Sequence, residues 1–178
     1  MSYKLGPAHP GSKELERLAV IYAETFAESP WGERHDPRQV QKTLQHILDM
    51  PDAIFLMALD ADSIPVGAMV GFSMDRKPEL CARMMLRGRV LFIDELFVVA
   101  SARGNGVAAM LVAGMISSAK IHGFHQAVVS TSIHEPVVRH LFLDHHGFTV
   151  AFEEDYIGRH LLPAAVLPTR RVVLVGSL

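Results

Sequence analysis

The feature that most constrains this chain is a hydrophobic segment that turns through two glycines directly into a run of small and apolar residues. The segment reads Leu96-Phe97-Val98-Val99-Ala100-Ser101-Ala102-Arg103-Gly104-Asn105-Gly106-Val107-Ala108. It predicts a buried strand, a tight turn and the start of a helix. A helix N-terminus offers unpaired backbone N–H groups and a partial positive charge, and glycine has no Cβ to block an anion. The pattern therefore predicts a phosphate-binding loop, to which Arg103 adds a cation.

Two common nucleotide-binding loops do not fit this segment. A Walker A loop needs a lysine followed by serine or threonine, and a dinucleotide-binding fingerprint needs a different glycine spacing. The segment therefore does not favour ATP or NAD as the ligand. A plain strand-to-helix turn that binds nothing stays open as an alternative.

Two amphipathic helices are predicted ahead of this loop. The first begins at Ser12, a predicted N-cap, and stops before Pro30, with apolar positions at helical spacing that include Tyr22. The second begins at Pro37 behind the cap Asp36 and ends at Leu48.

The remaining chain alternates between strands and helices. After a short strand over 2–6 and the two helices, we expect strands over 53–59 and 66–74, a basic segment over 76–89 with a short helix, a strand over 90–99, a helix over 104–121, a strand over 126–130, a helix over 136–145, and strands over 148–152 and 171–175. The order predicts an α/β fold with a mixed sheet.

Length and composition limit the kind of protein. The 178 residues fit one domain, 1–178, and 49% hydrophobic residues exclude a disordered chain. The longest apolar stretch, 107–116, is about half of the roughly 20 residues that a membrane helix needs, and the N-terminus lacks a secretory signal. A net charge of −2 gives no general attraction to nucleic acid or to an anionic membrane. We expect a cytoplasmic protein with neither as a partner.

Metal binding is not indicated by the sequence. Cys81 is the single cysteine, so neither an internal disulfide nor a cysteine zinc site is expected. Among the ten histidines, His134 and His140 lack the one-turn spacing that places two ligands on one helix face. We therefore expect no metal.

The chain resembles the GNAT superfamily of N-acetyltransferases over nearly its whole length. Arg103, Gly106 and Ala108 match the family's signature of Gln or Arg, two residues, Gly, one residue, then Gly or Ala. A strand, a helix and the pair Gly147-Phe148 follow in the family's order. The resemblance implies a mixed, mostly antiparallel central sheet of about seven strands, with helices on both faces and a splay between the fourth and fifth strands.

The resemblance also implies acetyl-CoA as the co-substrate. Its pyrophosphate would lie on the backbone amides of the glycine loop, and its pantetheine arm would pair with the strand before the loop. The Val98 N–H would stabilise the oxyanion that forms when an amine attacks the thioester. The implied residues are Leu96, Phe97 and Val98 for the arm, and Arg103, Gly104, Asn105, Gly106, Val107, Ala108 and Ala109 for the pyrophosphate.

The implied reaction is direct transfer of an acetyl group to the primary amine of a small molecule. Acetylation of a protein N-terminus or lysine is one alternative, and a non-catalytic CoA-binding module is another. A nucleotide-binding regulator is a third, which predicts binding of ATP or NAD instead of CoA.

A general base has to lie beside the splayed edge, and Glu95 matches a position that is often acidic in the family. Because side chains alternate along a strand, we expect Asp94 and Glu95 to point to opposite faces of the sheet. The family's usual general acid, a tyrosine four residues before the Gly of Gly-Phe, is Leu143 here. The replacement acids are His140, three residues earlier and expected on the same helix face, and Tyr156, with water as a further alternative.

The acceptor site is predicted from acidic residues around Trp31. Glu28, Glu33 and Asp36 would form an acidic, aromatic-walled mouth suited to a cationic amine. Asp94 is a further predicted substrate-binding residue.

The basic segment over 76–89 lies where the family often builds a substrate lid or a dimer contact. It could act as a lid, as a homodimer contact, or as a site that attracts an acidic peptide or an acyl phosphate, and a solvated loop without such a role stays open as the alternative.

Overall fold

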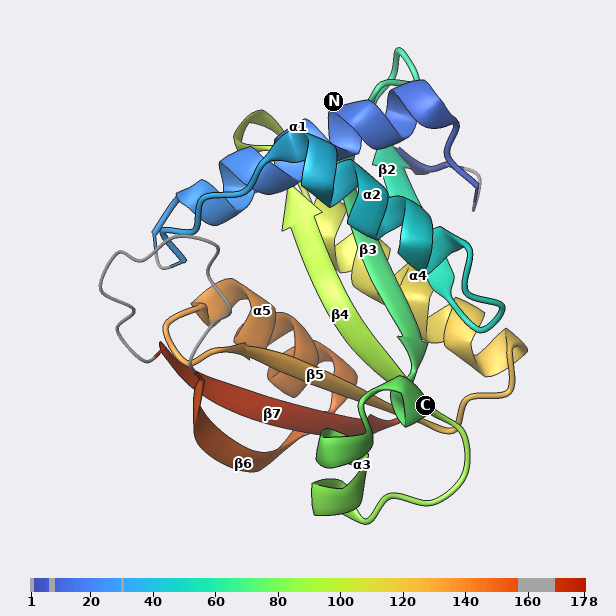
Figure 1. Cartoon of the computed structure of the whole chain (residues 1–178), viewed down its shortest axis with the longest axis vertical. Helices are drawn as coiled ribbons and strands as arrows, with labels where there is room; N and C mark the ends of the chain where they lie inside the picture. Colours follow the sequence, from blue (N-terminus) through green and yellow to red (C-terminus); the bar gives the residue numbers. More distant parts are fainter. Residues whose placement is uncertain (1, 7–8, 30, 157–168) are drawn as a thin grey trace.

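The computed structural model describes residues 2–6, 9–29, 31–156 and 169–178. Its strands form one seven-stranded sheet in the order β1-β2-β3-β4-β5-β7-β6 (Figure 1). The strands are β1 (Lys4–Leu5), β2 (Ile54–Leu59), β3 (Pro65–Ser73), β4 (Val90–Val98), β5 (Gln126–Ser132), β6 (Thr149–Tyr156) and β7 (Thr169–Ser177). The helices are α1 (Ser12–Ala27), α2 (Pro37–Leu48), α3 (Pro78–Met84), α4 (Val107–Ile121) and α5 (Pro136–His140), and a π-helical turn (Leu141–His145) follows α5.

The sheet is antiparallel except where β4 meets β5. These two strands run parallel and pair only over Val90–Ile93 and Gln126–Val129. Beyond this short ladder β4 continues beside β3, and β5 continues beside β7, so the two strands diverge (Figure 1). The predicted mixed, mostly antiparallel sheet with a splay between its fourth and fifth strands is confirmed.

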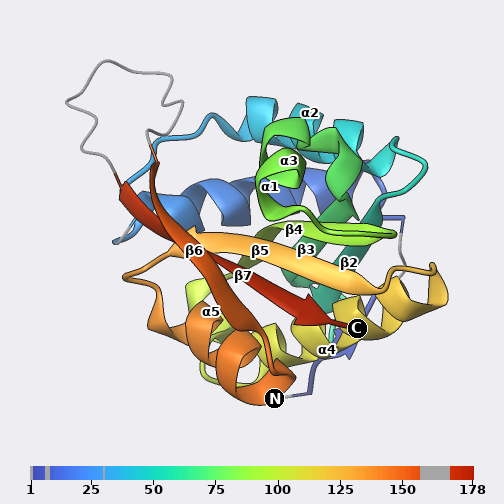
Figure 2. The ribbon, with the colours of Figure 1, turned by 90° about the horizontal axis from the view of Figure 1, so that it is seen from below.

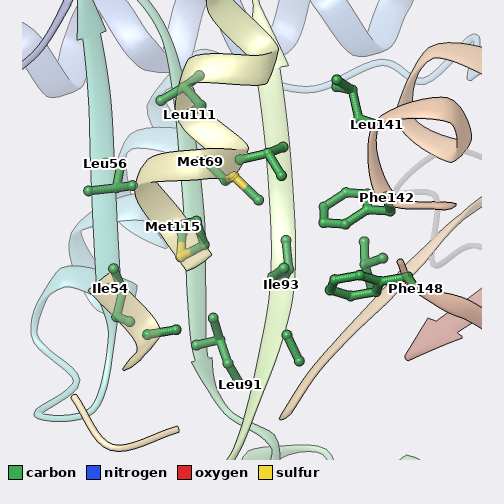
Figure 3. Packing of buried hydrophobic residues seen from close by; sticks show 14 of the residues in the cluster. Ile54, Leu56, Met69, Leu91, Ile93, Leu111, Met115, Leu141, Phe142 and Phe148 are labelled. Atoms are coloured by element: carbon green, nitrogen blue, oxygen red, sulfur yellow. The ribbon is translucent and has the colours of Figure 1, made fainter. Parts of the chain in front are cut away.

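Helices cover both faces of the sheet, as predicted. α1, α2 and α3 lie on one face, and α4 and α5 lie on the other (Figure 2). On the α4 side, Leu111 and Met115 pack against strand residues such as Ile93, and Phe142 and Phe148 extend the cluster toward α5 (Figure 3). A second buried cluster fills the space between the sheet and α1 with α2. These two apolar layers hold the sheet between the helices.

The start of α2 follows the N-cap signal in the sequence, whereas the start of α1 does not. Asp36 caps α2, since its side chain accepts a hydrogen bond from Arg38 N over 3.0 Å. The predicted N-cap of α1 is wrong: Gly11 occupies that position, without a side-chain cap, and Ser12 is already helical. The extended backbone of Gly11 allows the helix to begin one residue earlier than the serine signal predicts.

Element ends differ from the predictions by a few residues. The helix expected from 104 starts at Val107, because residues 104–106 form the loop itself. The helix expected over 136–145 is interrupted by the π-helical turn. Of the helices within the described ranges, none is long and apolar enough to cross a membrane.

Candidate active site

The divergence of β4 from β5 leaves backbone groups of β4 facing an opening. The Val99 N–H, just past the end of β4, donates to Val66 O over 2.8 Å, toward β3. Successive backbone groups of a strand point to alternate sides, so the N–H groups of Leu96 and Val98 point toward the opening. An extended ligand that enters there can pair with β4 as a strand would.

The glycine loop follows β4 and ends in the N-terminus of α4. Gly104 and Gly106 both have positive φ, +73° and +78°, which only glycine adopts without strain. Asn105 braces the loop, since its Nδ2 donates to Arg103 O over 3.0 Å. The first hydrogen bond of α4 joins Met110 N to Gly106 O over 3.0 Å. The N–H groups of residues 107–109 therefore have no partner within the helix, and they form an anion-binding terminus.

Arg103 does not extend freely from this loop. Its Nε donates to Val98 O over 2.9 Å, and its two terminal nitrogens contact both carboxylate oxygens of Glu28. Glu28, predicted to bind the acceptor, therefore joins the end of α1 to the glycine loop. The Arg103 guanidinium, predicted to face a phosphate, is paired with protein groups in this structure.

Glu95 lies beside the opening, and a residue of α1 binds its side chain. The Tyr22 hydroxyl donates to Glu95 Oε1 over 3.0 Å. Burial, followed by the negative charge of Asp94, raises the pKa of Glu95 to about 8. Burial and the nearby Glu95 carboxylate raise the pKa of Tyr22 as well, so its phenol remains a donor. A carboxyl whose pKa lies near neutral pH is suited to accept a proton during catalysis.

Asp94 and Glu95 do not point to opposite faces, and that prediction is wrong. A β-bulge pairs Val70 with Glu95 and Gly71 with Ile93, which leaves Asp94 as the extra residue. The bulge shifts the alternation of side chains by one position. Asp94 contacts Lys77, ahead of α3, and Glu95 contacts α1, both on the same side of the sheet.

Lys77 gives Asp94 a cationic partner inside the site. Its Nζ lies 3.2 Å from Asp94 Oδ1 and 4.9 Å from the centre of the Phe92 ring. The Asp94 side chain is 22% exposed, so the pair lies at the margin of the interior. The Asp94 carboxylate and the face of the Phe92 ring together hold the ammonium group of Lys77.

One large cleft, of about 1540 Å³, connects these features. Its walls include the glycine loop, the divergent part of β4, the turn after α1 and the start of α5. The predicted site residues that line the cleft are Glu28, Trp31, Asp94, Glu95, Leu96, Phe97, Val98, Arg103, Gly104, Gly106, Val107, Ala108 and Ala109. The cleft thus brings together a strand edge, an anion-binding helix terminus and a carboxyl with a raised pKa.

Two predicted acids lie elsewhere or are not described. The His140 side chain is exposed, bonds Asp144 and His145, and does not line the cleft. It does not share a face with Leu143, which packs against the α4-side core, because the π-helical turn changes the helical phase. Tyr156 ends β6, and its side chain lies outside the described part of the structure, as does Pro30.

Sequence reasoning missed several cleft residues with polar groups, among them Tyr22, Lys77 and Glu135. Tyr22 fitted the apolar stripe of a helix, Lys77 belonged to a basic segment, and Glu135 belonged to a region without a recognised motif. Burial raises the pKa of Glu135, and the charge of Arg103 acts in the opposite direction. The hydroxyl of Tyr22 was the available signal, since a buried tyrosine needs a hydrogen-bond partner.

Sequence comparison assigns the family. The model of the acetyltransferase (GNAT) family matches residues 15–148, about three quarters of the chain. The chain belongs to the GNAT family of acetyltransferases. No curated protein sequence matches it significantly.

Solved GNAT structures share the fold. Arabidopsis thaliana NAA60 in complex with acetyl-CoA is 17% identical, with a TM-score of 0.75 and coverage of 99% of either chain. Ribosomal-protein-alanine N-acetyltransferase from Brucella melitensis is 15% identical, with a TM-score of 0.75 and full coverage of both chains (100%). A phosphinothricin acetyltransferase from Sinorhizobium meliloti in complex with acetyl-CoA is 14% identical, with a TM-score of 0.74. The match covers 100% of this chain and 89% of the S. meliloti chain. At these identities the likeness shows the GNAT fold and not the acceptor.

Proposed function

We propose that this GNAT protein transfers an acetyl group from acetyl-CoA to the primary amine of a small molecule by direct attack. The observation that carries the proposal is the placement of Glu95 in one cleft with the open edge of β4 and the N-terminus of α4. The base, the strand edge and the anion site are the three parts that such a transfer requires.

The residues of the cleft fit acetyl-CoA. At Gly104 and Gly106 an added Cβ would meet no described atom within 4 Å, so the loop leaves space beside the unpaired amides of residues 107–109. The edge of β4 at Leu96, Phe97 and Val98 would pair with the amide groups of the pantetheine arm. Acetyl-CoA would supply the acetyl group as a thioester. The solved relatives from A. thaliana and S. meliloti, both in complex with acetyl-CoA, support this assignment.

Glu95 would accept the proton of the acceptor amine as the new bond to carbon forms. The Val98 N–H would donate to the carbonyl oxygen as it gains negative charge. Leu143 offers no proton donor at the position of the family's tyrosine. A thiolate leaves without a strong acid beside it, because an ordinary thiol has a pKa of about 8.5, and we propose water or Tyr156 as the proton source.

The acceptor end of the cleft favours a small cationic amine. Asp94 and the Phe92 ring already hold one primary ammonium group, that of Lys77. The segment around α3 is joined to the sheet there by the Lys77–Asp94 pair and by an ion pair between Arg83 and Glu154. Residues of this segment line the cleft, which supports its proposed role as a lid over the acceptor.

Acetylation of a peptide is the second candidate. It is favoured by the likeness to the B. melitensis enzyme, whose name gives a ribosomal protein as its substrate. A peptide needs an open groove, whereas a lid at the acceptor end would narrow it, and we therefore place the small amine first. A CoA-binding module without activity is the third candidate, because Leu143 lacks a proton donor. Cytoplasmic location, the homodimer and the absence of a metal stay predictions.

Calorimetric titration with acetyl-CoA, with ATP and NAD as controls, tests the proposal. We expect micromolar binding of acetyl-CoA alone, followed by release of free thiol when small amines and short peptides are screened as acceptors. Binding without turnover of any amine would leave the CoA-binding module as the function. Absence of acetyl-CoA binding would overturn the proposal.

A further inference from the structure

A contact between α1 and β4 gives Tyr22 a role that its place in an apolar stripe does not predict. Its hydroxyl donates to Glu95 Oε1 over 3.0 Å. We propose that Tyr22 is the positioning residue of the base: it holds one oxygen of Glu95 in place and leaves the other for the acceptor amine. The inference rests on the proposed function, in which Glu95 accepts the proton of the amine.

Aromatic packing fixes the Tyr22 ring, so its hydroxyl has a defined place. The ring centre lies 4.4 Å from that of Phe26 and 5.3 Å from that of Phe97. The His35 ring closes a third side at 5.1 Å. Phe26 belongs to α1 and Phe97 to β4, so the hydroxyl is positioned by both elements that it joins. A rigid donor orients a carboxylate with little further loss of conformational entropy.

The bulge in β4 makes this contact geometrically available. If side chains alternated regularly from Ile93 through Asp94, Glu95 would point toward α4. The bulge turns Glu95 toward α1, where its carboxylate accepts a hydrogen bond from the Tyr22 hydroxyl. Tyr22 contacts Oε1 and Glu95 lines the cleft, so we infer that Oε2 is the oxygen that faces the acceptor.

The charges around Glu95 require such a donor. Asp94 in β4 and Glu33 in the turn after α1 both disfavour a second negative charge at Glu95. Tyr22 in α1 and Arg171 in β7 act in the opposite direction. Tyr22 donates a hydrogen bond directly to Glu95, so it favours the ionised form that a base needs before it accepts a proton.

A purely structural contact between α1 and β4 would act differently. Loss of that contact would weaken the fold or lower the rate equally at every pH. Loss of a donor that stabilises the ionised form would instead raise the pKa of Glu95 and move the pH dependence of the rate.

Tyr22→Phe tests the proposal, because it removes the hydroxyl and keeps the ring. Glu95 is titrated by NMR in protein labelled with ¹³C at the glutamate carboxyl, and its signal is assigned by its loss in Glu95→Gln. We expect the midpoint of Glu95 to rise by about one pH unit in Tyr22→Phe. We expect kcat at neutral pH to fall about threefold to tenfold, with recovery at higher pH and little change in KM for acetyl-CoA. Tyr3→Phe is the matched control, since Tyr3 packs against the α4-side core and does not line the cleft.

An unchanged midpoint in Tyr22→Phe overturns the proposal, as does a loss of rate that is uniform over pH. If Tyr22→Phe does not fold, 3-fluorotyrosine incorporated at position 22 keeps the shape and strengthens the donor, so the midpoint has to fall. The titration needs no turnover. Absence of acetyl transfer in the unmodified chain would therefore refute the proposed function, and the titration would still decide whether Tyr22 controls Glu95.

Discussion

Asp94 and Glu95 are consecutive residues whose carboxylates lie on the same side of the sheet. The β-bulge opposite Val70 and Gly71 produces this arrangement, and it places two like charges beside the opening between β4 and β5. The charge of Asp94 contributes, after burial, to the raised pKa of Glu95, while Lys77 binds Asp94 from the other side. We propose separate roles for the two carboxyls: Glu95 would exchange a proton with the acceptor, and Asp94 would set the local charge.

Asp94→Asn is expected to lower the pKa of Glu95, because it removes a negative charge that favours the protonated form. The midpoint of the pH profile of kcat/KM should fall by about half a unit to one unit, opposite in sign to the change in Tyr22→Phe. The measurement is thiol release over pH 5–9 at a subsaturating amine concentration. The matched control is Asp62→Asn, in the exposed turn between β2 and β3. An unchanged midpoint in Asp94→Asn would show that the charge of Asp94 does not affect the titration of Glu95.

Gly106→Ala is expected to abolish most acetyl-CoA binding. A Cβ at this position would enter the space in front of the α4 amides, and the φ of +78° would add strain of about 1–2 kcal/mol. Gly147→Ala is the matched control, since Gly147 has a φ of +66° and similar open space and does not line the cleft. Calorimetry should show at least a tenfold loss of affinity in Gly106→Ala alone, about 1.4 kcal/mol. Equal losses in both variants would mean that strain, and not the phosphate site, is responsible.

Lys77→Met is expected to improve the binding of cationic acceptors. The methionine keeps an apolar chain near Phe92 but frees Asp94 for an ammonium group of the substrate. KM for an alkyl amine should fall about threefold or more, whereas the free energy of unfolding should change by less than about 1 kcal/mol, because the pair is partly exposed. Arg83→Met removes the other ion pair of the lid and serves as the control. A rise of KM in both variants would mean that Lys77 acts only by attaching the lid.

Local signals were sufficient for most of the fold and for the glycine loop. The Asp36 cap and the turn through Gly104 and Gly106 each depend on residues within a few positions, so the pattern in the sequence carried the information. The family resemblance supplied the splay, which no local pattern encodes. Ser12 failed as a cap because Gly11 already allowed the helix to start.

The parts that could not be predicted depend on contacts between distant segments. The bulge depends on how β3 and β4 approach each other, where a Cβ on Gly71 would lie 2.9 Å from Phe92 O. The Tyr22–Glu95 bond spans 73 positions, and the Arg103–Glu28 pair spans 75. Such pairs are visible only after α1 has been placed on the sheet. Alternation along an ideal strand therefore assigned Asp94 and Glu95 to opposite faces.

Glu95→Gln is expected to lower kcat about 100-fold or more, because glutamine cannot accept the proton of the amine. The affinity for acetyl-CoA should stay within about twofold, since the anion site and the strand edge are unchanged. Thiol release and calorimetry check the two quantities, with Glu16→Gln on the exposed face of α1 as the control. Full activity in Glu95→Gln would assign the base to another residue of the cleft.

The same substitution is expected to stabilise the fold at high pH. The pKa of Glu95 is raised to about 8 in the folded protein, above that of a glutamate in the unfolded chain. Between those two values the folded state holds one more proton, so stability falls as pH rises toward 8. Glutamine carries no charge at any pH. The free energy of unfolding of Glu95→Gln should therefore exceed that of the parent chain by more than about 1 kcal/mol at pH 8–9, and the difference should shrink toward pH 5. Denaturant unfolding at both pH values measures it, and a constant difference would show that the folded state does not resist ionisation of Glu95.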